Sequence, residues 1–107
     1  MNFKKLPDME NWFTRFGVSA SLAKDFAWIV SCAYENAYYG YGLGELFNSN
    51  ATVRDLVDHY GMDKIKPVII AVGRIGWAKC AEDLDYEKEC REKFIEVWNN
   101  SGLKYEN

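Results

Sequence analysis

The chain contains 107 residues, of which 49% are hydrophobic and 16% aromatic, and its formal net charge is −3. This apolar content excludes a disordered chain, and the length fits one domain around a single core. The sequence contains no apolar run long enough for a membrane helix and no leader with a cleavage site. We therefore expect a cytoplasmic protein without a membrane span.

The acidic charge is concentrated toward the C-terminal end. Residues 81–107 carry eight acidic and four basic groups, whereas residues 52–80 carry three acidic and five basic groups. An acidic surface disfavours nonspecific binding of the whole molecule to nucleic acid. The middle of the chain can still present a local basic face.

The cysteines do not form a recognisable framework. Cys32, Cys80 and Cys90 are odd in number and lack CxxC spacing, so we expect reduced, mostly buried thiols. A zinc site would have to recruit His59 from another segment, and we predict neither a metal nor a cofactor.

The first part of the chain predicts two helices. After an extended lead, Pro7 suits a first helical position and Gly17 an exit, with an aromatic stripe at helical spacing between them: Met9, Trp12, Phe13 and Phe16. Ser19 or Ser21 then caps a second helix that runs to about Tyr39. One face of this helix is apolar (Leu22, Phe26, Ile29, Val30, Ala33, Ala37 and Tyr38), and Trp28 and Cys32 widen it.

Residues 38–47 form the most unusual segment, YYGYGLGELF. Glycines at 40, 42 and 44 break regular structure, and a preceding helix with this glycine spacing does not fit a nucleotide-binding loop. Two interpretations remain. The segment is either a linker whose tyrosines fold back on the core or a partner-binding loop. Residues 48–50 complete it as a polar turn.

The organising element is the unit from Thr52 to Lys79. Thr52 and Asp55 resemble a capping box, and Gly61 suits the end of a short helix. A second helix begins near Asp63 or at Pro67 and is apolar almost all round, which is typical of a helix in the middle of a core. We expect Ile70, inside its longest apolar run, to be fully buried.

The C-terminal part predicts an amphipathic helix over about Tyr86–Asn100, capped by Asp83 or Asp85. Its apolar side carries Tyr86, Cys90, Phe94, Val97 and Trp98. Its charged side offers the pairs Glu87–Arg91 and Glu89–Lys93 at (i, i+4) spacing.

No motif predicts catalysis. The single histidine, His59, has Asp55 four residues earlier, but no nucleophile or oxyanion loop accompanies this pair. We interpret His59 as a partly exposed side chain at a helix C-terminus, where positive charge is favoured. We predict that the protein is not an enzyme.

A DNA-binding regulator is the alternative function. The unit around Gly61 is similar to a helix-turn-helix, and Lys64, Lys66 and Arg74 are placed to contact phosphate. Its second helix, however, offers no Asn, Gln or Ser between Pro67 and Val72 to read a base edge. We therefore rank this function second.

The segment RDLVDHYGMDKIKPVIIAVGRIGWA resembles small uncharacterised helical domains encoded on phages and mobile elements of gut Firmicutes. The matching positions are Leu56, Tyr60, Gly61, Asp63, Val68, Ala71 and Trp77, and Pro67 departs from the usual apolar residue. No activity is established for that pattern. The resemblance implies an accessory protein of a mobile element.

We predict an all-α fold: one compact domain over residues 1–107, with four to five helices and the helix-turn-helix-like unit inside it. The expected function is non-enzymatic binding of a protein partner, such as a nucleic-acid-processing complex, as in a phage inhibitor of host defence of the anti-CRISPR type. Its acidic stretch, Glu82–Glu96, would face a basic nucleic-acid channel. The predicted partner-binding residues lie in the Tyr/Gly segment and on this helix: Tyr39, Tyr41, Leu43, Glu45, Glu87, Glu89 and Glu92.

Overall fold

The computed structural model describes residues 8–103, and these form six helices and no strand. The helices are α1 (Met9–Arg15), α2 (Ala20–Tyr38), α3 (Glu45–Ser49), α4 (Ala51–Tyr60), α5 (Met62–Ala81) and α6 (Leu84–Asn100). The predicted all-α fold is confirmed, but six helices replace the predicted four to five, and the additional helix α3 lies in a stretch predicted to be a loop. Within the described residues, no helix is both long and apolar enough to cross a membrane.

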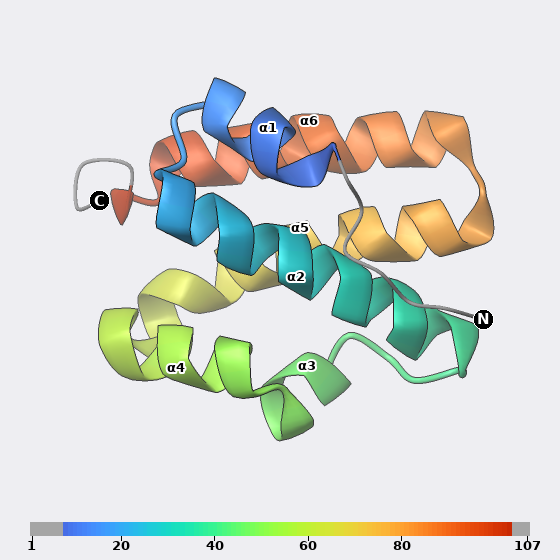
Figure 1. Cartoon of the computed structure of the whole chain (residues 1–107), viewed down its shortest axis with the longest axis horizontal. Coiled ribbons are helices and arrows are strands. Elements are labelled where there is room, and N and C mark those ends of the chain that lie inside the picture. Colours follow the sequence, from blue (N-terminus) through green and yellow to red (C-terminus); the bar gives the residue numbers. More distant parts are fainter. Residues whose placement is uncertain (1–7, 104–107) are drawn as a thin grey trace.

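The helices α2 and α5 form the central pair of the molecule (Figure 1). On one side, α1 packs against α2 and α6 packs against α5; α3 and α4 cover the other side. The central pair can approach closely because Gly76 of α5 faces the backbone of α2. A Cβ at position 76 would lie 2.3 Å from the carbonyl oxygen of Val30.

An aromatic cluster joins α1, α2 and α6. Phe94 of α6 lies with its ring centroid 5.0 Å from Phe13 and 5.9 Å from Phe26, both edge-on. Trp98 lies 5.9 Å from Phe26, also edge-on. These four rings are fully buried. The predicted aromatic stripe of α1 is therefore core packing on its Met9–Phe13 side, whereas Phe16 is exposed.

Three side chains cap helix N-termini. Ser19 accepts from the backbone N–H of Leu22, and Asp83 accepts from that of Tyr86, as predicted. The predicted cap of α4 is wrong: Asn50 Oδ1, and not Thr52, accepts the N–H of Val53 at 3.0 Å. Asn50 has extended backbone angles, whereas Thr52 already lies inside the helix. Asparagine is also among the best N-cap residues.

The helix α5 begins at Met62, directly after Gly61, whose φ of +90° suits glycine. Pro67 lies inside the helix and is exposed. Its ring thus removes one backbone hydrogen bond on the solvent side rather than in the core. Of the two predicted starting points, the one near Asp63 agrees with the structure to within one residue.

Three expectations about burial are wrong. Ile70 is only half-buried, although Ile69 and Val72 beside it are fully buried. Trp28 and Tyr38 are 46% and 54% exposed and do not belong to the core. The reason is geometric, because a helix that packs on its neighbours along one side leaves the opposite residues of an apolar run uncovered.

Candidate functional site

Three adjoining hollows run along the outer side of α5, and together they form what we call the α5 groove. Arg74 lines all three, Leu43 lines two, and Tyr86 lines two, so the hollows are continuous. The largest has a volume of about 400 Å³. From α5 the lining is Met62, Lys66, Ile70, Ala71, Arg74 and Trp77; from the preceding segment Gly42, Leu43, Gly44 and Phe47; and from α6 Tyr86, Glu89, Cys90 and Lys93.

The groove follows from the helical repeat of α5. Its lining side chains recur at positions 62, 66, 70, 74 and 77, which places them in one stripe along the helix. The opposite side carries Ile65, Ile69, Val72 and Ile75, all fully buried. The central helix therefore has one side in the core and one side in the floor of the groove.

One wall of the groove is the segment 42–47. Leu46 of α3 is fully buried. A Cβ added to Gly73 would lie only 2.9 Å from Cδ1 of Leu46 and 3.0 Å from Cδ2 of Leu43. The glycine at position 73 thus lets both leucines rest on α5. Phe47, half-buried, lies beneath Lys66, whose Nζ is 6.0 Å from the ring centroid.

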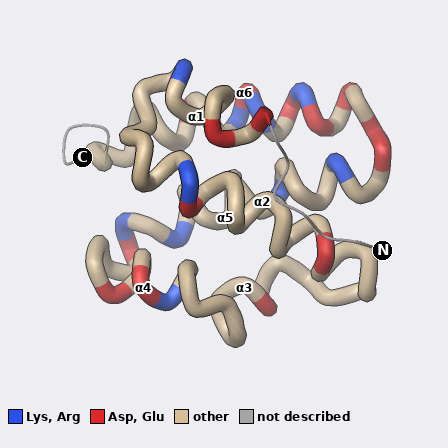
Figure 2. Tube along the Cα trace, in the orientation of Figure 1, with Lys and Arg blue, Asp and Glu red and all other residues tan. Residues whose placement is uncertain are grey.

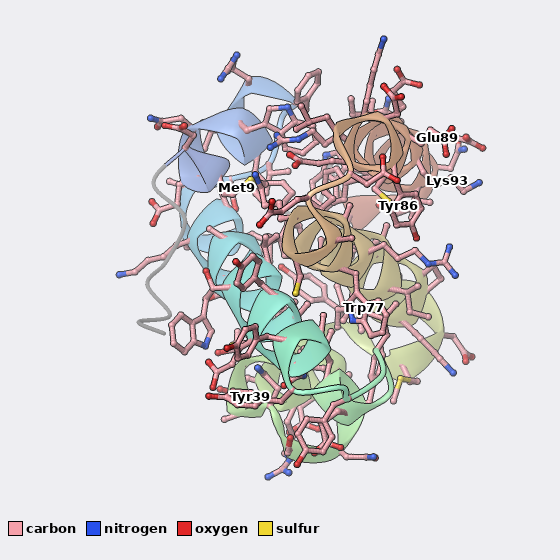
Figure 3. The ribbon with its side chains drawn as sticks, turned by 90° about the vertical axis from the view of Figure 1, so that its right-hand side faces the viewer. Met9, Tyr39, Trp77, Tyr86, Glu89 and Lys93 are labelled. Carbon is pink, nitrogen blue, oxygen red and sulfur yellow. The ribbon has the colours of Figure 1, made fainter. Side chains whose placement is uncertain are left out.

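The other wall is the outer side of α6. Figure 3 shows Trp77, Tyr86, Glu89 and Lys93 on one side of the molecule, with Met9 on the opposite side. Tyr86 is 41% exposed. Tyr86 and Cys90 both line this wall, and burial raises the pKa of both the phenol and the thiol. Both groups are therefore neutral at physiological pH.

The groove carries positive charge in an acidic protein. Its lining holds three basic side chains (Lys66, Arg74 and Lys93) and one acidic side chain (Glu89). The predicted pair Glu89–Lys93 is wrong: Lys93 Nζ instead lies 3.5 Å from Glu96 Oε1. Among the described residues, no carboxylate lies within ion-pair distance of Lys66 or Arg74. Two exposed cations therefore border the apolar floor, and residues 8–103 supply neither with a partner of opposite charge.

The predicted partner-binding residues fall into separate places. Tyr39 and Tyr41 are 59% and 55% exposed at the end of α2, so they do not fold back on the core. Leu43 and Glu89 lie in the α5 groove. Glu45 is half-buried in the first turn of α3, and Glu92 is exposed on α6. Acidic residues gather where α5 meets α6 and along α6 (Figure 2).

Glu87 is engaged within the protein. Nη2 and Nε of Arg91 donate to its Oε2 at 2.6 and 2.8 Å, and Lys79 Nζ lies 3.1 Å from the same oxygen. Burial alone would raise the pKa of this carboxyl, but the hydrogen bonds and charges of Arg91 and Lys79 lower it overall. Arg91 also lies 4.8 Å from the Trp12 ring. Glu87 thus ties α6 to α5 and, through Arg91, to α1.

The predicted phosphate-binding residues do not form one patch. Lys66 and Arg74 share the α5 groove, whereas Lys64 lines a separate hollow with Pro67 and Val97. Two residues along a helix correspond to a rotation of about 200°, which places Lys64 on another side of α5.

His59 lies at the C-terminal end of α4, exposed, with its ring 4.5 Å from that of Tyr60. The described residues contain no group of three or more His, Cys, Asp or Glu side chains placed to hold a metal ion. The three cysteines are free thiols, with Cys90 buried and the other two half-buried.

The sequence predicted only Leu43, Lys66, Arg74 and Glu89 of the groove lining as binding residues; the large apolar side chains Phe47, Met62, Ile70 and Trp77 are among those that it missed. The available signal was the four-residue spacing of Met62, Lys66, Ile70 and Arg74, which mixes cations with apolar groups in one stripe. Comparison with protein-family models, curated proteins and solved structures gave no match to this chain.

Proposed function

We propose that this chain is a non-enzymatic protein-binding domain whose binding face is the α5 groove together with Tyr39 and Tyr41. The observation that carries the proposal is the uncovered apolar floor on the outer side of the central helix. Leu43, Ile70 and Trp77 are half-buried there and open to a partner. Contiguous apolar surface rimmed by polar groups marks interaction sites.

Tyr41 and Tyr86 lie beside or in the groove, whereas Figure 3 shows Tyr39 apart from Trp77 and Tyr86, toward the other side of the molecule. Tyr41 directly precedes Gly42, which borders the groove, and Tyr86 forms part of its wall. Tyrosine offers a large contact area and one hydrogen-bonding group while losing few rotamers, which explains its enrichment among interface hot spots. Tyr41 and Tyr86 are 55% and 41% exposed, so both rings can contact a partner.

The biological setting that we propose is an accessory protein of a phage or mobile element that inhibits host defence, of the anti-CRISPR type. This part rests on the resemblance of residues 54–78 and on the acidic surface of α6. Glu89 and Glu92 are exposed there and can complement a basic channel of a nucleic-acid-processing complex. The binding face itself does not depend on this setting.

Paired affinity capture tests the proposed function. The wild-type chain and Tyr39→Ser/Tyr41→Ser are used as baits in lysate from the natural host, and captured partners are then titrated as purified proteins. We expect the double variant to keep its melting temperature, because both rings are exposed, and to weaken binding by about 2 kcal/mol or more.

Trp28→Ser is the matched control, since Trp28 is an exposed aromatic on α2 outside the binding face. It should leave the partner affinity unchanged. Equal affinities of the double variant and the wild type would contradict the role of the two tyrosines. A lower stability with unchanged affinity would make them structural.

DNA binding is the second candidate, and the geometry of α4 and α5 favours it. A single residue, Gly61, joins the two helices. Lys66 and Arg74 are exposed on one side of α5. The stripe between the two cations presents Ile70, which cannot donate to a base edge. A regulator would still shift duplex DNA, with an affinity that falls steeply as salt increases.

We expect no shift of promoter or random duplexes at physiological salt. The decisive comparison uses Lys66→Ala/Arg74→Ala, with Lys64→Ala as the control on another side of the helix. A salt-sensitive shift that is lost in the double variant and kept in the control would reverse the order of the two functions.

A further inference from the structure

We infer that the partner segment held by the α5 groove is acidic and amphipathic: its apolar side chains fill the hollows, and its carboxylates pair with Lys66 and Arg74. The inference rests on the proposed protein-binding function and names the chemistry of the partner. A segment of this kind is a short helix with apolar residues on one side and Asp or Glu at its edge.

The charges of the groove carry the first step. Lys66 and Arg74 border the apolar floor, and no described carboxylate lies within ion-pair distance of either. A neutral apolar segment laid over this floor would strip water from both cations without replacing it, which is costly. A segment that brings two carboxylates removes that cost and fixes its own register.

The spacing of the cations sets the length of the partner segment. Lys66 and Arg74 are eight residues apart on α5, which corresponds to about 12 Å along the helix axis. Ile70 lies midway between them on the floor of the largest hollow. A partner helix with carboxylates seven or eight residues apart, and a large apolar side chain between them, matches this arrangement.

The hollows favour apolar side chains over nucleotide bases. The largest is bounded by Leu43, Phe47, Met62 and Ile70 and measures about 400 Å³, enough for aliphatic or aromatic side chains. Phe47 lies beneath Lys66, so its face is not open for a base to stack on. A single-stranded nucleic acid is therefore the competing occupant, and the experiment includes it.

A charge-inversion experiment tests the inference. Two synthetic helical peptides of about sixteen residues carry the same Leu/Phe stripe. One places Glu, and the other Lys, at two positions eight residues apart. Binding to the full chain is measured by fluorescence anisotropy, and the site is located by ¹⁵N–¹H NMR, with the Trp77 indole as reporter. Trp77→Phe assigns the indole signal.

We expect the wild-type chain to bind the Glu peptide at least about tenfold more tightly than the Lys peptide. The variant Lys66→Glu/Arg74→Glu should reverse this preference. Arg15→Glu/Lys24→Glu is the matched control, because it makes the same change of net charge at exposed positions outside the groove. It should keep the wild-type preference.

Equal affinities for the two peptides, or a preference that does not reverse, would overturn the inference. Displacement of the Glu peptide by a single-stranded oligonucleotide that binds more tightly would overturn it in favour of nucleic acid. Phe47→Ser should weaken both peptides, because Phe47 bounds the hollow that takes the apolar side chains. Unchanged affinities in this variant would contradict the apolar part of the inference while the protein-binding function stands. If neither peptide binds, the inference fails, and the capture experiment with the tyrosine variants decides the proposed function separately.

Discussion

At the scale of single residues, two positions determine how closely the helices approach each other. Gly76 faces the carbonyl of Val30 across the central pair, and Gly73 faces the ends of Leu43 and Leu46. The neighbour of Gly76 is backbone and cannot move alone, whereas the neighbours of Gly73 are flexible side chains. The same substitution should therefore have different effects three residues apart.

We predict that Gly76→Ala lowers the free energy of unfolding by about 3 kcal/mol or more, because α2 and α5 must separate to admit the new methyl group. Gly73→Ala should change it by no more than about 1 kcal/mol, since helix propensity favours alanine and offsets the side-chain shifts. Urea denaturation followed by circular dichroism measures both. Similar losses in the two variants would contradict the close approach at Gly76.

Glu87 provides a prediction about pH. Its pKa is lower in the folded chain, so the ionised carboxylate stabilises the fold above the ordinary glutamate value of 4.5. This contribution is lost as the pH falls through the folded value. Glu87→Gln should cost about 1–2 kcal/mol at neutral pH, and the difference from wild type should shrink in acid.

Thermal denaturation across the pH range checks this prediction, with Glu92→Gln as the control. Glu92 is exposed and has no ion-pair partner among the described residues. Its variant should follow the wild type at every pH. If the stability that Glu87→Gln loses relative to the wild type stayed the same in acid, the ion pairs of Glu87 with Lys79 and Arg91 would not be its cause.

Asp25 should behave in the opposite way. Burial, and next the charge of Asp55, raise the pKa of this carboxyl. Ionisation therefore costs stability at neutral pH, and the cost disappears as the pH falls below the ordinary value. Asp25→Asn should raise the melting temperature slightly at neutral pH. The gain should be absent in acid, and a loss of stability at neutral pH would contradict the assignment.

At the scale of elements, α5 shows what a sequence can and cannot predict. Its apolar run correctly predicted the central helix, because such a run can be covered only inside a core. The run did not reveal which residues face outward, since Ile69 and Ile70 are chemically identical and differ only by a rotation of about 100°. That rotation separates the core from the groove.

The contrast between these two isoleucines is testable. Ile69→Asp places a charge where no solvent reaches and should abolish cooperative unfolding. Ile70→Asp should leave a folded, helical protein, because the side chain borders the groove, but it should weaken partner binding. Circular dichroism during heating distinguishes them. Equal loss of structure in both variants would mean that the outer side of α5 is also core.

Other elements follow the same pattern. Local signals identified the caps at Ser19 and Asp83, because capping depends on adjacent residues alone. The helix α3 was missed, since its five residues follow three glycines and are held by burial of Leu46 against α5 rather than by propensity. The groove brings together residues from 42 to 93. No local sequence pattern reports which distant segments become neighbours.

At the scale of the whole molecule, the core and the binding face use opposite sides of one helix. The aromatic cluster and the buried side of α5 hold the six helices together, while the outer side is bordered by α6 and the segment 42–47 without being covered. The central claim is that a partner protein covers this outer side. Its position can be tested without knowing the partner in advance.

Site-specific photocrosslinking in the natural host is the most direct measurement. Benzoylphenylalanine replaces Tyr86 in one chain and Trp28 in another; the two positions are 41% and 46% exposed and so are equally open to solvent. Irradiation should join a discrete protein to the chain from position 86, identified by mass spectrometry, and nothing specific from position 28. A discrete protein joined from position 28 but not from position 86, or a nucleic acid joined from position 86, would contradict the α5 groove as a protein-binding site.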